Sequence, residues 1–109
     1  MDRVFKALAD KSRRKLLDRL FARNGQALGE LADALAMTRQ AVAKHLAVLE
    51  RAGLIATRRR GREKLHYLNP VPIRQIADRW IGKFERHRLR ALAELKSSLE
   101  ENNHERKSG

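Results

Sequence analysis

The side chains best suited to chemistry in this sequence are cationic, and they gather in one short segment. Four arginines and one lysine fall within seven positions around Gly61. Like charges held this close repel one another, so an anion is expected to offset them, and DNA phosphates or the minor groove fit that requirement. The alternative is an edge hairpin that charge protects from aggregation. The cluster consists of Arg58, Arg59, Arg60, Arg62 and Lys64.

A second polar set lies at helical spacing just before this cluster. Glutamine can read adenine, arginine or lysine can read guanine, and an alanine methyl can touch a thymine methyl while permitting close approach. An apolar face of Val42, Leu46 and Leu49 would anchor the helix that carries them. The alternative is an ordinary amphipathic helix with a solvated outer face. The candidate DNA-reading residues are Thr38, Arg39, Gln40, Ala43 and Lys44.

No catalytic or metal-binding constellation emerges from the remaining residues. The chain has no cysteine, which excludes disulfides, thiolate metal sites and thiol redox chemistry. Its histidines are scattered, and it lacks a glycine-rich phosphate loop, so we expect no enzyme. The last predicted helix has no His-x3-His or His-x2-Glu pair, so we also expect no metal and no cofactor. A metal sensor with an unusual ligand set remains the alternative.

The charge balance points to a polyanionic partner. The chain of 109 residues has 25 Lys and Arg against 13 Asp and Glu, for a net charge of +12. Such an excess favours double-stranded DNA, and an anionic membrane surface is the other option. Acidic residues on the last predicted helix weaken the membrane interpretation. No apolar run approaches the ~18 residues of a membrane span, and no secretory signal is evident, so we expect a cytoplasmic protein.

Apolar periodicity and capping signals predict the elements that position these residues. A short helix, a tight turn, a second helix and a basic hairpin over residues 28–68 predict a winged helix-turn-helix, whose second helix enters the major groove. The fold class is therefore mostly α with a small β-hairpin. We expect one domain over residues 1–101 and a flexible tail over 102–109. The predicted elements are one or two helices in 2–24 with a break near Asp10 or Ser12, helices 28–36 and 39–52, strands 55–60 and 63–68, and a long helix 73–101.

The long last helix carries an apolar stripe that overhangs a small domain. This favours a homodimer interface shared with the first helix, although the stripe could instead cover its own domain. Arg88 interrupts the stripe and could mark where the helix leaves the interface. The expected interface residues are Val4, Phe5, Leu8, Ile73, Ile76, Trp80, Phe84, Leu92 and Leu95, with Leu99 at the end of the stripe.

Several segments together resemble the ArsR/SmtB family of bacterial winged-helix repressors. They are Phe5–Asp10 with Arg13–Leu17, Gly29–Ala32, Thr38–Ile55, and Gly61-Arg62 before Tyr67-Leu68. The resemblance covers about residues 2–70 and implies a homodimer with the winged helix in the major groove. Founding members sense metals through cysteines in the helix before the recognition helix, or through Asp, His and Glu clusters on the last helix. This chain has no cysteine there, which places it in a non-metal-sensing branch.

These observations combine into one expected function. We expect a sequence-specific repressor that binds a pseudo-palindromic operator as a homodimer, with Gln40 and Lys44 reading bases and Arg62 holding the backbone. Repression of its own gene would suit a regulator without a metal inducer. A packaging protein that binds nucleic acid without sequence preference is the alternative, and the ratio of specific to non-specific affinity separates the two. The sequence does not identify an effector.

Overall fold

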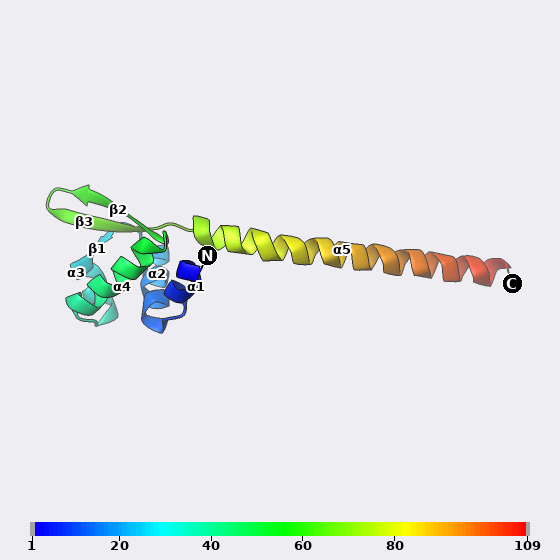
Figure 1. The fold of residues 1–109 in the computed structure, drawn as a ribbon, viewed down its shortest axis with the longest axis horizontal. Coiled ribbons are helices and arrows are strands. Elements are labelled where there is room, and N and C mark those ends of the chain that lie inside the picture. Colours follow the sequence, from blue (N-terminus) through cyan, green and yellow to red (C-terminus); the bar gives the residue numbers. More distant parts are fainter. Residues whose placement is uncertain (1, 109) are drawn as a thin grey trace. The chain divides into compact units, whose positions relative to one another are not determined.

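The computed structural model describes residues 2–108, with side chains described for residues 2–101. The chain divides into two compact units, Met1–Arg74 and Gln75–Gly109. Every element before the last helix lies in the first unit, and the last helix from Gln75 onward forms the second unit (Figure 1). The elements are α1 (Asp2–Leu8), α2 (Lys11–Ala22), β1 (Gln26–Ala27), α3 (Leu28–Leu35), α4 (Arg39–Arg51), β2 (Ile55–Arg60), β3 (Glu63–Leu68) and α5 (Val71–Ser108).

Side-chain caps set the starts of α2 and α4. Asp10 precedes α2, and its carboxylate accepts a hydrogen bond of 3.0 Å from the backbone N–H of Arg13. That N–H bond favours the charged carboxylate and lowers the pKa of Asp10. Thr38 precedes α4, and its Oγ1 accepts a 3.1 Å hydrogen bond from the N–H of Ala41. Both caps confirm the predicted helix starts and satisfy N–H groups that a helix leaves unpaired.

Left-handed residues end α3 and α4. Ala36 has a φ of 52° after α3, and the N–H of Met37 bonds the carbonyl of Ala32 at 3.0 Å. Gly53 has a φ of 76° after α4, where glycine avoids the steric cost of that conformation. The N–H of Leu54 then bonds the carbonyl of Leu49 at 3.0 Å, which closes the helix end. The short turn between α3 and α4 fixes the angle at which α4 is presented.

A three-stranded antiparallel sheet follows, with strand order β1-β3-β2. The hairpin strands β2 and β3 have the predicted bounds and are joined by Gly61 and Arg62. Gly61 has a φ of 61°, which a two-residue loop with glycine at its first position requires. We call this hairpin the wing. The third strand, β1, was not predicted: Gln26 pairs with His66, and Ala27 pairs with Leu65.

The core of the first unit lies among its helices and the start of the wing. Its largest fully buried apolar side chains come from α2, α3, α4 and Leu54, which follows α4, so the apolar face of α4 packs against the core. Gln26 is also buried, and its amide oxygen accepts from Arg19 Nε at 3.2 Å. The largest fully buried apolar side chains are Leu16, Leu20, Leu31, Val42, Leu49 and Leu54.

The last helix differs from its predicted bounds. It begins at Val71 rather than at residue 73, because Pro72 lies in the first turn, where the missing N–H costs no helical hydrogen bond. Its backbone continues to Ser108. The predicted tail over 102–109 falls outside the residues with described side chains and stays a prediction. Among the described residues, no helix is both long and apolar enough to cross a membrane.

The cap of α4 gives a testable expectation for stability. Thr38→Ala removes the hydroxyl that accepts from Ala41, so we expect the free energy of unfolding to fall by about 1 kcal/mol. Thr38→Ser retains the hydroxyl and should stay close to the parent. Urea unfolding followed by circular dichroism measures both. Equal losses in the two variants would show that the hydroxyl does not cap the helix.

Candidate nucleic-acid interface

The outer face of α4 is fully available for contact. Gln40, Ala43 and Lys44 are all exposed, while Val42 on the opposite face is completely buried. A helix held by one buried face and carrying small and hydrogen-bonding side chains on the other can approach base edges closely. The structure therefore brings together the side chains that were predicted on α4.

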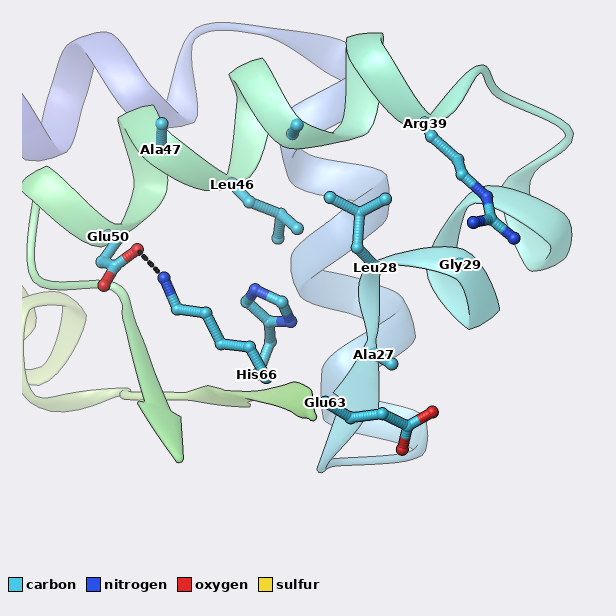
Figure 2. Close-up of a pocket in the computed structure, with 11 residues that line it drawn as sticks. Ala27, Leu28, Gly29, Arg39, Leu46, Ala47, Glu50, Glu63 and His66 are labelled. Carbon is cyan, nitrogen blue, oxygen red and sulfur yellow. Dashed lines mark hydrogen bonds and ion pairs between the residues drawn. The ribbon is translucent and has the colours of Figure 1, made fainter. Parts of the chain in front are cut away.

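Arg39 lies at one end of this face, above the start of α3. Figure 2 shows its side chain reaching toward Gly29, where a Cβ atom would come within 3.2 Å of Arg39 Nη2. The residue before α3, Ala27, provides no side-chain cap. A guanidinium beside N–H groups without a side-chain cap favours an anion, so Arg39 is better placed for a phosphate than for a base edge.

The strand register divides the basic cluster between two faces of the wing. Arg59 lies directly opposite Lys64, and Thr57 lies opposite His66, so these four side chains share one face. The other face carries Arg58, opposite Leu65, and Arg60, opposite Glu63. The sequence interpretation treated the cluster as one set, whereas the sheet separates its members.

A groove runs between α4 and the face of the wing that carries Lys64. Its volume is about 390 Å³, and Ala43, Leu46 and Ala47 of α4 line one side (Figure 2). His66 lines the other side, and its Nδ1 lies 2.9 Å from the backbone carbonyl of Gln26. A carbonyl only accepts, so Nδ1 carries the proton in this contact. By register, Arg59 and Lys64 thus belong to the side of the wing that faces α4.

One ion pair connects the wing to α4. Lys64 Nζ lies 3.5 Å from Glu50 Oε2, and both side chains are nearly half exposed (Figure 2). A pair this exposed contributes little to stability. In the part of the chain with described side chains, the four wing arginines form no ion pair with an acidic residue. Their charge is therefore available to an external anion.

The opposite face of the wing is also hollowed. A depression of about 340 Å³ is lined by Arg58, Arg60, Leu65 and Tyr67 of this face, and Arg59, whose register places it on the other face, also contributes to its lining. Its lining is dominated by cationic side chains, so it too favours an anion. All five predicted DNA-binding residues of the wing are exposed, namely Arg58, Arg59, Arg60, Arg62 and Lys64.

Two arginines outside the predicted site serve the fold. Arg13 donates from Nε to the carbonyl of Ala7 at 2.8 Å and from Nη2 to that of Lys6 at 2.9 Å. Arg14 donates from Nη1 to the carbonyl of Leu8 at 2.7 Å. These carbonyls end α1 and would otherwise lack partners. Part of the positive charge is thus used to join α1 to α2.

The predicted interface residues differ in how much surface they offer. Val4 is only 7% exposed and belongs to the core of the first unit, so it offers little surface to a partner. Phe5 and Ile73 are exposed, Leu8 and Ile76 are partly buried, and Trp80 is 49% exposed. The later apolar residues of α5 are more than half exposed, and they are Ile81, Phe84, Leu89, Leu92, Leu95 and Leu99.

No metal centre is formed by the side chains that the structure describes. Among them, no three histidine or carboxylate groups lie close enough to hold a metal ion. The candidates on α5, including Asp78, Glu85, His87 and Glu94, form no such group.

Comparison with known sequences supports this interpretation of the site. A family model described as a helix-turn-helix domain matches residues 8–58. The chain is 43% identical over 86 residues to YuzN of Bacillus subtilis, an uncharacterised HTH-type transcriptional regulator, covering 73% of this chain and 94% of that protein. It is 31% identical over 84 residues to the transcriptional repressor SdpR of the same species, covering 77% and 91%.

Solved structures show the same architecture. An ArsR-like transcriptional regulator from Rhodococcus sp. RHA1 superposes with a TM-score of 0.71 at 33% identity, covering 89% of this chain and 90% of that one. A homodimeric winged helix-turn-helix DNA-binding domain from Mycobacterium bovis gives a TM-score of 0.62 at 29% identity, covering 77% and 78%. The matched proteins are described as transcriptional regulators, and one of them as a DNA-binding domain. The chain therefore belongs to the ArsR/SmtB family of winged helix-turn-helix DNA-binding transcriptional regulators.

Proposed function

We propose that the chain is a sequence-specific repressor that binds a pseudo-palindromic DNA site as a homodimer. The observation that carries the proposal is the exposed face of α4, which presents Gln40 and Lys44 beside a wing whose arginines form no ion pair with the acidic side chains that the structure describes. The repressor role is supported by the relative named a repressor. The homodimer is supported by the solved structure described as homodimeric.

The candidate interface residues divide into those that would contact base edges and those that would contact the DNA backbone. Gln40 and Lys44 have the chemistry to bond base edges in the major groove, with Ala43 between them leaving room for the duplex. Arg39 lies above the start of α3 and would bind a phosphate. Arg62 lies at the wing tip and would hold the backbone or enter the minor groove. Thr38 positions this set through the cap of α4.

A homodimer would contact more base pairs than a single copy. One recognition helix covers only a few base pairs, and two-fold pairing doubles the sequence that is read. The half-sites would then lie about 34–36 Å apart, or at a multiple of that distance. The exposed apolar stripe of α5, with Phe5 of α1, supplies the surface for this pairing.

Selection of preferred duplexes from random DNA tests the proposal. We expect an enriched site with inverted symmetry, bound at least about 1,000-fold more tightly than random duplex at the same salt concentration. The affinity ratio is measured by competition at fixed ionic strength. Enrichment of no sequence, with equal affinity for all duplexes, would instead identify a packaging protein.

The wing tip gives a prediction about salt dependence. Arg62→Ala should weaken specific and random duplexes alike and reduce the slope of log affinity against log salt by about one, because one phosphate contact is lost. Arg62→Lys retains the charge and should keep the slope. Fluorescence anisotropy at several salt concentrations measures both. A slope unchanged by Arg62→Ala would remove this residue from the backbone contacts.

Metal ions are expected to leave DNA binding unchanged. The absence of cysteine motivates this proposal, because arsenite and cadmium sensing depends on thiolates. Zinc, cadmium, arsenite and thiol oxidants should not release the protein from its site, and calorimetry of metal-free protein should show no stoichiometric binding. A sub-micromolar event that lowers DNA affinity would contradict this expectation. If metals have no effect, occupancy of the DNA site would depend on protein concentration or on an unidentified small molecule. Repression of its own gene would suit such a regulator.

A further inference from the structure

The groove between α4 and the wing has the size and the lining of a small-molecule site. Its volume of about 390 Å³ falls within the range of roughly 300–1,000 Å³ that such sites occupy. Ala43 and Ala47 project little from α4 and so leave the groove open, while Leu28 and the buried Leu46 add apolar surface. A ligand with an apolar body could therefore lie along α4 in this groove.

His66 supplies a hydrogen-bond acceptor to the groove. Its side chain is 4% exposed, and its Nδ1 donates to the carbonyl of Gln26, so the other ring nitrogen, Nε2, is the acceptor in that tautomer. Within the described residues, Nε2 forms no hydrogen bond, and no buried side-chain nitrogen or oxygen lacks a partner. Nε2 is therefore accessible from the groove that His66 lines. A ligand hydroxyl or N–H could donate to it.

The charges along the groove determine where an anionic group would bind. Arg39 begins α4 and Glu50 lies in its last turn, so the two residues line opposite ends of the groove (Figure 2). At the Glu50 end, the charge of Lys64 is offset by their ion pair of 3.5 Å. Arg39 forms no ion pair with any side chain that the structure describes. Because a guanidinium can bind a carboxylate through two parallel N–H bonds, the anionic group is expected at Arg39.

Glu63 limits the charge that a ligand can carry. This exposed residue of the wing lines the same groove, and its carboxylate is not offset by an ion pair with any described side chain. It repels a doubly charged ligand more strongly than a singly charged one. A phosphate ester carries a charge of about −1.5 to −2 at neutral pH, so the groove favours a monocarboxylate.

We propose that this groove binds a small monocarboxylate with an apolar body and a hydrogen-bond donor, and that the bound ligand excludes DNA from α4. The carboxylate would bond Arg39, the apolar body would cover Ala43, and the donor would bond Nε2 of His66. Ala43 lies on the exposed face of α4 beside Lys44, so a ligand and a duplex would compete for this face. The competition rests on the proposed function, whereas ligand binding itself does not.

Calorimetry and NMR spectroscopy of the DNA-free protein test the site. The probes are p-hydroxybenzoate and p-hydroxyphenylacetate, each of which has one carboxylate, one ring and one hydroxyl. We expect saturable binding at equal stoichiometry with the chain, together with shifts of the His66 ring signals. Methyl p-hydroxybenzoate lacks the charge and p-methoxybenzoate lacks the donor. Each should bind at least about tenfold more weakly than p-hydroxybenzoate, because it loses a polar contact.

Two alanine positions provide a matched pair of variants. Ala47→Leu fills the groove from α4 without adding a charge, so it should abolish probe binding. Ala34→Leu makes the same change at an exposed position of α3 outside the groove and should bind the probes as the parent does. Circular dichroism verifies that both variants are folded. Absence of saturable binding of either probe to the parent, or binding that Ala47→Leu leaves unchanged, would overturn the site.

Competition with DNA is measured separately, by fluorescence anisotropy of a labelled duplex selected from random DNA. Saturating p-hydroxybenzoate should reduce the affinity of the parent for this duplex by at least about tenfold, whereas the methyl ester at the same concentration should not. Probe binding that leaves DNA affinity unchanged would overturn the competition. A parent that selects no sequence would overturn the proposed function, while the result in DNA-free protein would still decide whether the groove is a ligand site.

Discussion

Replacing Lys44 or Gln40 with alanine should change which sequence the protein prefers. Both side chains are exposed on α4, and the buried residues Val42 and Leu49 anchor the opposite face of that helix in the core. Loss of a base contact costs about 1–3 kcal/mol on the best site, which corresponds to roughly 5- to 150-fold in affinity. Affinity for random duplex should change far less, so the specificity ratio falls by nearly the same factor.

The control for this prediction is a lysine that is exposed but lies on α2. Lys15→Ala removes the same charge as Lys44→Ala and leaves the outer face of α4 intact. It should keep the preferred sequence and the specificity ratio. Repeating the random-DNA selection with each variant shows whether individual positions of the site lose their preference. An unchanged selected sequence for both Gln40→Ala and Lys44→Ala would exclude these two residues as base contacts.

Helix ends near the site could be predicted because their signals are local. Thr38 precedes an amphipathic pattern, and Gly53 follows it, so capping chemistry alone indicates where α4 begins and ends. The wing could be predicted equally well, because its alternating side chains and its glycine turn lie within 14 residues of sequence. In each case the interactions join residues close in sequence.

Features that depend on distant partners were not predicted. The strand β1 has only two residues, and its pairing with His66 and Leu65 joins segments about 40 positions apart. Too few residues alternate there for a period to be recognised. The buried side chain of Gln26 follows from the same pairing, since only the folded sheet brings it beside His66.

The basic cluster shows a second limit of prediction from the sequence. Composition identifies five neighbouring cations, but only the register of β2 with β3 shows which of them are paired across the wing, as Arg59 and Lys64 are. Likewise, the arginines Arg13 and Arg14 look like part of a DNA-binding charge until their bonds to the carbonyls of α1 are seen. Net charge therefore predicts the class of partner better than it predicts the contacting residues.

The largest effect on DNA binding is expected from Phe84→Glu, far along the chain from α4. Phe84 is 62% exposed in a single copy and belongs to the exposed apolar stripe of α5. A carboxylate there would be buried without a partner on dimerisation, which opposes association strongly. We expect sedimentation at micromolar concentration to shift from dimer to monomer. Trp80→Glu should act in the same direction.

Loss of the dimer should weaken operator binding by at least about 100-fold, because two linked recognition helices gain from effective concentration and a single one does not. Ala93→Glu is the matched control, since residue 93 lies nine positions beyond Phe84 and so about 180° around the helix. It introduces the same charge at an exposed position. It should remain dimeric and bind the operator as the parent does. If Phe84→Glu became monomeric yet bound the full palindrome as tightly as the parent, dimerisation would have no role in recognition, and each recognition helix would have to supply its specificity alone.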